Sequence, residues 1–264
     1  MKKSTPAWRR TLFVFLPPIV ALTLGIALIL QALPASSDSE ATLPEETTTS
    51  PSTSQARFQY GILQDSLIHS QWVVVNKHRP LPRDFQTPEL VVIAASSSLE
   101  NPRGLKLRAD AAAALQEMAR DMARLGAGVL FINSAHRTYE YQSQLFQAKV
   151  KQYGLSLALL KSAKAGYSEH QTGLAVDVSV PAQGCAILEC FGETKAGKWI
   201  ADFSWRYGYI VRYERETTDV TGYAYEPWHL RYIGKEFAKE YHEGGFTTLE
   251  DFWGLPPAPD YLAN

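Results

Sequence analysis

The chain has 264 residues, 45% of them hydrophobic, which is enough for one substantial globular domain with appendages. Its formal net charge of -1 at pH 7 argues against the large basic surface that nucleic-acid binding requires. We therefore expect no nucleic-acid partner.

The beginning of the chain combines a basic start with a long uncharged run. Four basic residues, Lys2, Lys3, Arg9 and Arg10, precede residues 11–37, which carry no charged side chain. A helix needs roughly 20 apolar residues to cross a bilayer core, so this run is long enough. A cleaved signal peptide also starts in this way, but its apolar core is usually only about 7–15 residues long. We therefore predict an uncleaved membrane anchor over residues 1–35, with its basic flank in the cytoplasm and the rest of the chain on the outer face of the cell membrane.

A polar linker is expected after this anchor. Residues 36–56 consist mainly of Ser, Thr, Pro and Glu, which offer almost nothing to bury and cannot offset the entropy lost on ordering. We predict that residues 36–56 are a flexible tether and that residues 57–264 form the functional domain.

The first half of that domain contains one unmistakable helix. Between residues 105 and 125, Ala111, Leu115, Met118 and Met122 recur at spacings of four and three, and Gly126 follows. Other elements are expected from local composition: a turn or short helix over Gly61–Asp65, a strand over Trp72–Val75, a proline-containing loop over Asn76–Pro82, a buried strand over Val129–Ile132, and helices over Tyr141–Tyr153 and Leu155–Ser162.

The second half adds further strands and helices without a regular order. Strands are predicted over Leu174–Ser179, Tyr209–Tyr213 and Trp228–Ile233, and helices over Lys198–Tyr207, Lys235–His242 and Thr248–Trp253. In the first of these strands, alternation should send Val176 and Val178 into the core and leave Asp177 on the other face. Because strands and helices do not alternate regularly, we predict an α+β domain with a small central antiparallel sheet flanked by helices.

Two segments about fifty positions apart carry residues that suit a metal site. His170 and Asp177 lie on either side of Gly173, and His229 follows Glu226 by three positions. Two imidazoles and one carboxylate are a normal ligand set for a catalytic zinc ion, which keeps a fourth position for water. A spare carboxylate such as Glu226 is the proton acceptor that metal-assisted hydrolysis needs. The pattern therefore predicts a zinc hydrolase.

Several longer motifs resemble one family of enzymes. The stretches SEHQTGLAVDV, EPWHLRYIG, VNKHRPLP, SAHRTYEYQSQLF and FGETKAGKWI are similar, in order and spacing, to the VanY-type D-alanyl-D-alanine carboxypeptidases. The resemblance covers nearly all of residues 70–253. It implies a small α+β fold, one zinc ion (Zn2+), and peptidoglycan stem peptides as substrates, from which the C-terminal D-alanine is removed.

The resemblance also implies roles for individual residues. It assigns zinc ligation to His170, Asp177 and His229, the catalytic base to Glu226, and substrate positioning to Arg137, Gln142 and Ser168. A guanidinium binds both oxygens of a terminal carboxylate, so Arg137 is the expected clamp, with Ser168 as its hydrogen-bond partner.

The chain departs from the family beside this clamp. The usual Ser-Gly-Tyr-Arg is here Ser134-Ala135-His136-Arg137. The histidine is expected to affect which terminal residue fits, and not hydrolysis itself, because the zinc ligands and the base are unchanged. We disfavour His136 as a fourth zinc ligand, because it would fill the position that water needs.

Three functions are open at this point. We favour a carboxypeptidase that cuts the D-Ala-D-Ala bond. The alternative is an L,D-carboxypeptidase that acts on tetrapeptide stems, and the choice between the two depends on pocket side chains that the motifs do not determine. A non-catalytic cell-wall binding module is disfavoured by Glu226, because a pure binder needs no base beside its metal. The two cysteines, Cys185 and Cys190, are either a loop-closing disulfide, which we favour on the outer face of a membrane, or two free thiols.

Overall fold

The computed structural model describes residues 68–263, all of which belong to one compact unit. The predicted anchor, the linker and the turn or short helix expected over Gly61–Asp65 lie outside the described residues. Within residues 68–263, no helix is both long and apolar enough to cross a membrane.

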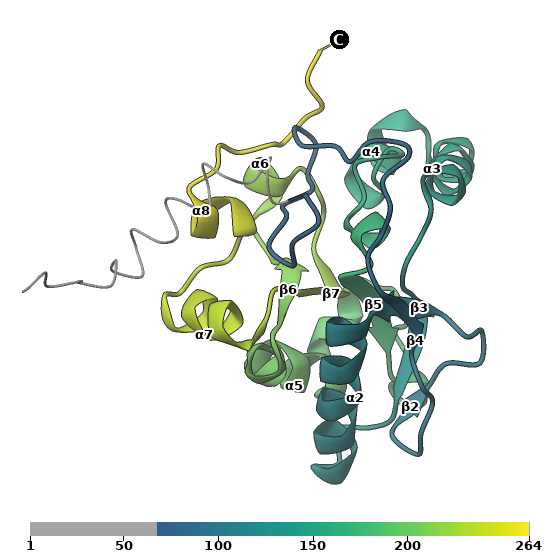
Figure 1. Ribbon diagram of the computed structural model, residues 1–264, viewed down its shortest axis with the longest axis vertical. Helices are drawn as coiled ribbons and strands as arrows, with labels where there is room; N and C mark the ends of the chain where they lie inside the picture. Colours follow the sequence, from purple (N-terminus) through teal and green to yellow (C-terminus); the bar gives the residue numbers. More distant parts are fainter. Residues whose placement is uncertain (1–67, 264) are drawn as a thin grey trace, which may run out of the picture. The chain divides into compact units, whose positions relative to one another are not determined.

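A five-stranded sheet forms the centre of the domain (Figure 1). Its strands lie in the order β2 (Leu99–Glu100), β4 (Leu130–Ser134), β5 (Ala175–Ser179), β7 (Glu226–Tyr232) and β6 (Tyr209–Tyr213). Neighbours are antiparallel except β2 and β4, which are parallel. The predicted α+β fold is confirmed, while the purely antiparallel sheet is corrected to a mixed one. Strand β2 is too short to show the alternation by which a sequence reveals a strand.

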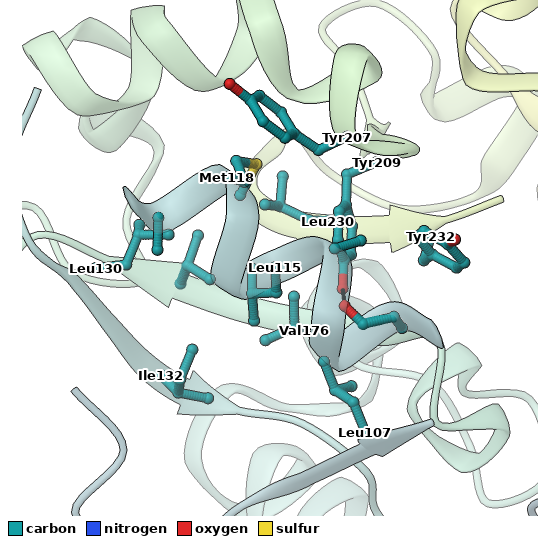
Figure 2. Close-up of a cluster of buried hydrophobic side chains, with 14 of the residues drawn as sticks. Leu107, Leu115, Met118, Leu130, Ile132, Val176, Tyr207, Tyr209, Leu230 and Tyr232 are labelled. Atoms are coloured by element: carbon teal, nitrogen blue, oxygen red, sulfur yellow. Dashed lines mark hydrogen bonds between the residues drawn. The ribbon is translucent and has the colours of Figure 1, made fainter. Parts of the chain in front are cut away.

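The long helix α2 (Ala109–Arg124) packs on one face of this sheet. Its buried Leu115 and Met118 meet side chains from three strands, among them Leu130 of β4, Val176 of β5 and Leu230 of β7 (Figure 2). The helix starts four residues later than predicted, because Lys106–Arg108 form strand β3 and pair with β1 (Leu90–Val92) in a separate two-stranded sheet.

A second apolar cluster lies around the C-terminal helices α7 (Lys235–Glu243) and α8 (Leu249–Trp253). Val74 belongs to this cluster, but the strand predicted over Trp72–Val75 does not form. The carbonyl of Val73 instead accepts a hydrogen bond of 2.6 Å from the side chain of Arg231. The β-branched residues are therefore buried without joining a sheet.

Helices α3 (Tyr139–Tyr153) and α4 (Leu155–Lys161) form a hairpin on the opposite side of the domain from α7 and α8 (Figure 1). Both helices were predicted. The helix expected over Lys198–Tyr207 is divided into α5 (Lys195–Phe203) and a 3-10 turn, η5 (Ser204–Tyr207). The remaining short elements are η2 (Glu169–Thr172), η3 (Pro181–Gln183), η4 (Glu189–Glu193) and α6 (Thr218–Thr221). Cys185 and Cys190 form a disulfide, the alternative favoured from the sequence.

Candidate active site

Asp177 and His229 are direct neighbours across two central strands. They pair in register between β5 and β7, so their side chains point to the same face of the sheet. Val176, Val178 and Leu230 belong to the buried core on the other face, as alternation predicts. Asp177 Oδ1 lies 3.1 Å from His229 Nδ1.

His170 joins this pair from the turn that precedes β5. The turn ends at Gly173 with a φ of 72°, where an added Cβ would also come within 2.9 Å of two neighbouring side chains. This tight return of the chain places His170 Nε2 at 3.3 Å from Asp177 Oδ1. One ligand atom from each of His170, Asp177 and His229 lies within 4.8 Å of the others, and all three residues are buried. We call these three residues the metal group.

The metal group fits a metal ion. His170 Nδ1 lies 2.7 Å from the carbonyl oxygen of Ala135, which can only accept, so Nδ1 carries the hydrogen and Nε2 offers its lone pair. That Nε2 is buried and has no hydrogen-bond partner within residues 68–263, although Asp177 is near. A buried polar atom without a partner costs about 1–3 kcal/mol. A metal ion held by the three residues would satisfy this nitrogen, and a His-Asp-His set suits zinc.

Electrostatics in the metal group also favours a cation. Burial lowers the pKa of His170 to about 4, with Arg137 acting in the same direction, so its imidazole is neutral. Burial alone would raise the pKa of Asp177, but the two histidines outweigh it and hold that pKa well below its usual range. Burial alone would lower the pKa of His229, but hydrogen bonds to Asp177 and Glu169 outweigh it and raise that pKa to about 9. A metal ion that bound at this group would have to displace a proton from His229.

Glu226 reaches the metal group because β7 is irregular. On a regular strand, residues three apart point to opposite faces. Here the pairing of β6 with β7 shifts register between Val211 and Tyr213, and Tyr213 lies opposite Glu226. Glu226 Oε2 is consequently 3.9 Å from His229 Nδ1. Burial raises the pKa of Glu226 to about 7, which suits a group that both takes and returns a proton.

A buried ionic network holds His229 from behind. Glu169 Oε2 lies 3.3 Å from His229 Nε2, so this second ring nitrogen is held by a carboxylate while Nδ1 faces Asp177. Glu169 Oε1 accepts hydrogen bonds of 2.9 Å from both Arg212 and Arg231. Arg212 donates two more, of 3.0 and 2.8 Å, to Glu250 of α8. The four charged side chains are 0% exposed, and two cations balance two anions.

Arg137 makes no ion pair of this kind among the described residues, although the negative charges of Asp177 and Glu226 act on it from a distance and act to raise its pKa. Its backbone N–H donates to the carbonyl of His170 at 3.1 Å, which fixes the residue beside the metal group. Its Nη2 lies 3.5 Å from Ser168 Oγ, at the limit of a hydrogen bond, and its buried Nε has no partner in the described part of the chain. Burial lowers the pKa of Arg137, yet a guanidinium stays charged. Arg137 is half-buried, lines the cavity described below and forms no ion pair within residues 68–263, so its guanidinium can bind an anion that enters there.

Two other residues singled out from the sequence lie apart from the metal group. Gln142 does not line the cavity described below; its Nε2 donates to the carbonyl of Ala163 at 2.7 Å and so supports the wall from behind. His136 lines the cavity without joining the metal group, and its Nε2 is 3.1 Å from Thr87 Oγ1.

A cavity of about 610 Å³ connects the metal group, Glu226, Arg137 and Ser168. This volume is in the range of small-ligand sites. Its walls also include apolar and aromatic side chains, among them Tyr141, Leu145, Ile187, Tyr213, Tyr223 and Trp228. The arrangement can therefore hold a short peptide end against a metal, a base and a cation.

The sequence reasoning missed the buried ionic network. A signal was present, since Arg212 and Arg231 lie inside segments predicted to be strands of the core. Charged residues at such positions are almost never buried without a partner. The sequence does not say which carboxylates are those partners.

The chain matches known proteins over this same region. The sequence model of VanY, D-alanyl-D-alanine carboxypeptidase, matches residues 104–235, which is half of the chain. The chain is 39% identical over 180 residues to a putative carboxypeptidase, YodJ, of Bacillus subtilis (strain 168), covering 68% of this chain and 66% of that protein.

Two solved structures are also similar. One is the LD-carboxypeptidase LdcB, with 37% identity and a TM-score of 0.65 over 71% of this chain and 87% of that one. Another is a vancomycin-resistance D,D-pentapeptidase VanY in complex with Zn(II), with 30% identity and a TM-score of 0.57 over 69% of this chain and 98% of that one. With the family match, the sheet and the His-Asp-His group all in agreement, the chain belongs to the VanY family of D-alanyl-D-alanine carboxypeptidases.

Proposed function

We propose that the chain is a zinc-dependent carboxypeptidase that removes the C-terminal D-alanine from peptidoglycan stem peptides. The observation that supports this most is that one cavity joins the metal group, Glu226 and Arg137, whose Nε has no hydrogen-bond partner within residues 68–263. Family membership supplies the reaction class, and the Zn(II) complex of a VanY relative supports zinc. We propose a single ion, because the three ligand atoms gather within one 4.8 Å group.

Each residue then has a defined task. His170, Asp177 and His229 would hold the zinc ion, which would supply a Lewis acid for the scissile carbonyl and for water near neutral pH. Glu226 accepts the proton of the attacking water and returns it to the leaving amine. Arg137 and Ser168 hold the terminal carboxylate, so the last peptide bond of the stem lies at the metal group.

The proposed role of Arg137 in binding the terminal carboxylate can be tested by substitution. Replacing Arg137 with lysine should raise KM for D-alanine release by about 10- to 100-fold, because hydrogen bonds to a charged group contribute about 1.5–3 kcal/mol and the paired geometry is lost. Steady-state kinetics measures this, with Arg120→Lys on exposed α2 surface as the control. An unchanged KM in the Arg137 variant would exclude the clamp.

Cleavage of an L,D bond in tetrapeptide stems is the alternative. It is favoured by the likeness to the LD-carboxypeptidase LdcB, whose TM-score of 0.65 and 37% identity exceed the 0.57 and 30% of the VanY complex. His136, which lines the cavity next to Arg137, is the residue we expect to influence this choice.

Metal removal tests the reaction and the substrate together. We expect D-alanine release from a pentapeptide ending in D-Ala-D-Ala to disappear after chelation and to return with zinc, because no other Lewis acid is provided by the side chains of the cavity. A tetrapeptide stem is run in parallel. Release from the pentapeptide alone supports the D,D activity, and release from the tetrapeptide alone supports the L,D alternative. Bound zinc without release from either stem would point to a non-catalytic cell-wall binding module.

We further propose that residues 1–35 anchor the protein in the cell membrane with the catalytic domain on the outer face, where peptidoglycan lies. The basic start and uncharged run of the sequence support this. The mature protein should sediment with membranes and retain its N-terminus, as shown by fractionation and N-terminal sequencing. A soluble form that begins near Ala35 would instead establish a cleaved signal peptide.

A further inference from the structure

The charged residues that line the cavity fall into two sets. The acidic set belongs to the metal group, the base or the buried network (Asp177, Glu226 and Glu169). The basic set, apart from Arg137, consists of Arg103, Lys149 and Lys161. Every charged side chain of the lining that has no task in the proposed reaction or the network is therefore a cation.

Lys149 reaches the cavity from one face of α3. Tyr141, Leu145 and Lys149 follow one another at intervals of four residues, and all three line the cavity. Helix α3 begins just after Arg137, and Lys149 lies about 15 Å along its axis at 1.5 Å per residue. This face of α3 therefore follows the cavity from a point near Arg137 to Lys149, whose ammonium lies 5.4 Å from the centre of the Tyr153 ring.

Lys161 enters from the end of α4. The carbonyl of the preceding Leu160 accepts a hydrogen bond of 3.0 Å from the N–H of Ala224, which ties this end of α4 to the segment that leads into Glu226. The ion pairs found among residues 68–263 involve neither Lys149 nor Lys161. Arg103, in contrast, already donates to the carbonyl of Asn133.

We propose that Lys149 and Lys161 form a subsite for a carboxylate that the stem peptide carries upstream of the bond that is cut. The inference rests on the proposed function, because it assumes a stem peptide in this cavity. An extended peptide spans at most about 3.3–3.6 Å per residue, so the residues two and three places before the C-terminal one lie about 7–11 Å from it. Those two residues of the stem would lie beside the middle of the cavity face of α3, about one helical turn before Lys149, within reach of its long side chain.

Two carboxylates of a stem peptide have the required chemistry. One is the side-chain carboxylate of diaminopimelate at the third position, which lysine at the same position lacks. The other is the α-carboxylate of the γ-linked D-glutamate at the second position, whose charge is removed by amidation. Diaminopimelate carries the same side-chain ammonium as lysine, so the two stems differ at this position by the carboxylate alone. We therefore expect a diaminopimelate stem to be preferred over a lysine stem by about tenfold in kcat/KM, a modest effect because exposed ion pairs are weak.

The test uses the full-length, zinc-loaded chain and three pentapeptide stems that all end in D-Ala-D-Ala. The first contains D-glutamate and diaminopimelate, the second D-glutamate and L-lysine, and the third amidated D-glutamate and diaminopimelate. For the wild type we expect the first stem to exceed the second by about tenfold. In the variant that combines Lys149→Gln with Lys161→Gln, this ratio should fall to about one. Lys151→Gln, on the exposed surface of the same helix, should keep the wild-type ratio.

The outcomes separate cleanly. Equal kcat/KM for all three stems in the wild type overturns the subsite, as does a preference that survives the double substitution. A lower kcat/KM for the amidated stem alone assigns the carboxylate to D-glutamate. A lower kcat/KM for the lysine stem alone assigns it to diaminopimelate, and both results support the subsite. If no stem releases D-alanine, the proposed function fails by itself. The ratio of dissociation constants for the same stems, measured by calorimetry, then decides whether the subsite stands.

Discussion

Replacing Glu226 with glutamine is expected to lower kcat for D-alanine release by about 10²- to 10⁴-fold, the usual contribution of a general acid-base group. Glutamine keeps the shape of the side chain 3.9 Å from His229 but cannot accept a proton. Because Glu226 is not one of the three ligands of the metal group, zinc should remain bound. Steady-state kinetics together with the zinc content of the purified variant measures both effects.

The matched control is Glu236→Gln, the same chemical change on the exposed face of α7. It should leave kcat and zinc content unchanged. A Glu226 variant that binds zinc and turns over as fast as the wild type would remove Glu226 from the mechanism. A variant that loses zinc would show instead that Glu226 supports the metal.

Replacing Glu250 with glutamine is expected to destabilise the domain by about 3–5 kcal/mol, although α8 lies outside the cavity lining. Arg212 would then share the single carboxylate of Glu169 with Arg231, and one positive charge would be left in a fully buried network. Two hydrogen bonds from Arg212 and one of 3.0 Å from Asn76 would also be weakened. Urea unfolding of the zinc-free protein measures the change, with Glu236→Gln again as the control.

A double variant distinguishes charge imbalance from simple loss of packing. Adding Arg212→Met to Glu250→Gln removes one cation as well as one anion, so Glu169 and Arg231 remain as a neutral pair. The double variant should be less destabilised than the sum of the single variants, with a coupling of about 0.5–3 kcal/mol. Strict additivity would mean that the network does not act as an electrostatic unit.

The gathering of the three residues of the metal group was predictable because they come from two short, regular patterns. Alternation along residues 174–179 separates Asp177 from the valines on the core side, and Gly173 marks the turn that brings back His170. The pairing of Asp177 with His229 depends only on two strands lying next to each other in register. Such local regularity is what a sequence displays most clearly.

The position of Glu226 was not predictable from strand geometry. Regular alternation would turn it away from His229, and the register shift that brings it back depends on how β6 pairs with β7. Glu226 was identified through its motif and not through a structural rule. Irregularities of this kind arise between strands, and a single strand's sequence does not reveal them.

Long-range pairing explains the remaining differences. The residues Trp72–Val75 have the composition of a strand, but Arg231 binds the carbonyl of Val73 from 158 positions away. Arg212 and Glu250 are 38 positions apart, and both look like ordinary charged residues when taken alone. Burial of such residues depends on partners that only the folded chain brings together.

The hydrogen bond between His170 and the carbonyl of Ala135 has an evolutionary consequence. A backbone carbonyl offers the same acceptor whichever side chain is attached to it, so the orientation of His170 does not depend on the identity of residue 135 beyond its small size. The neighbouring His136 lines the cavity and is not one of the three residues of the metal group. Under the proposed function, substitutions at position 136 would change the wall of the cavity and leave the three residues of the metal group as they are. If the proposed function holds, a lineage with this loop could acquire a new preference without passing through an inactive ancestor.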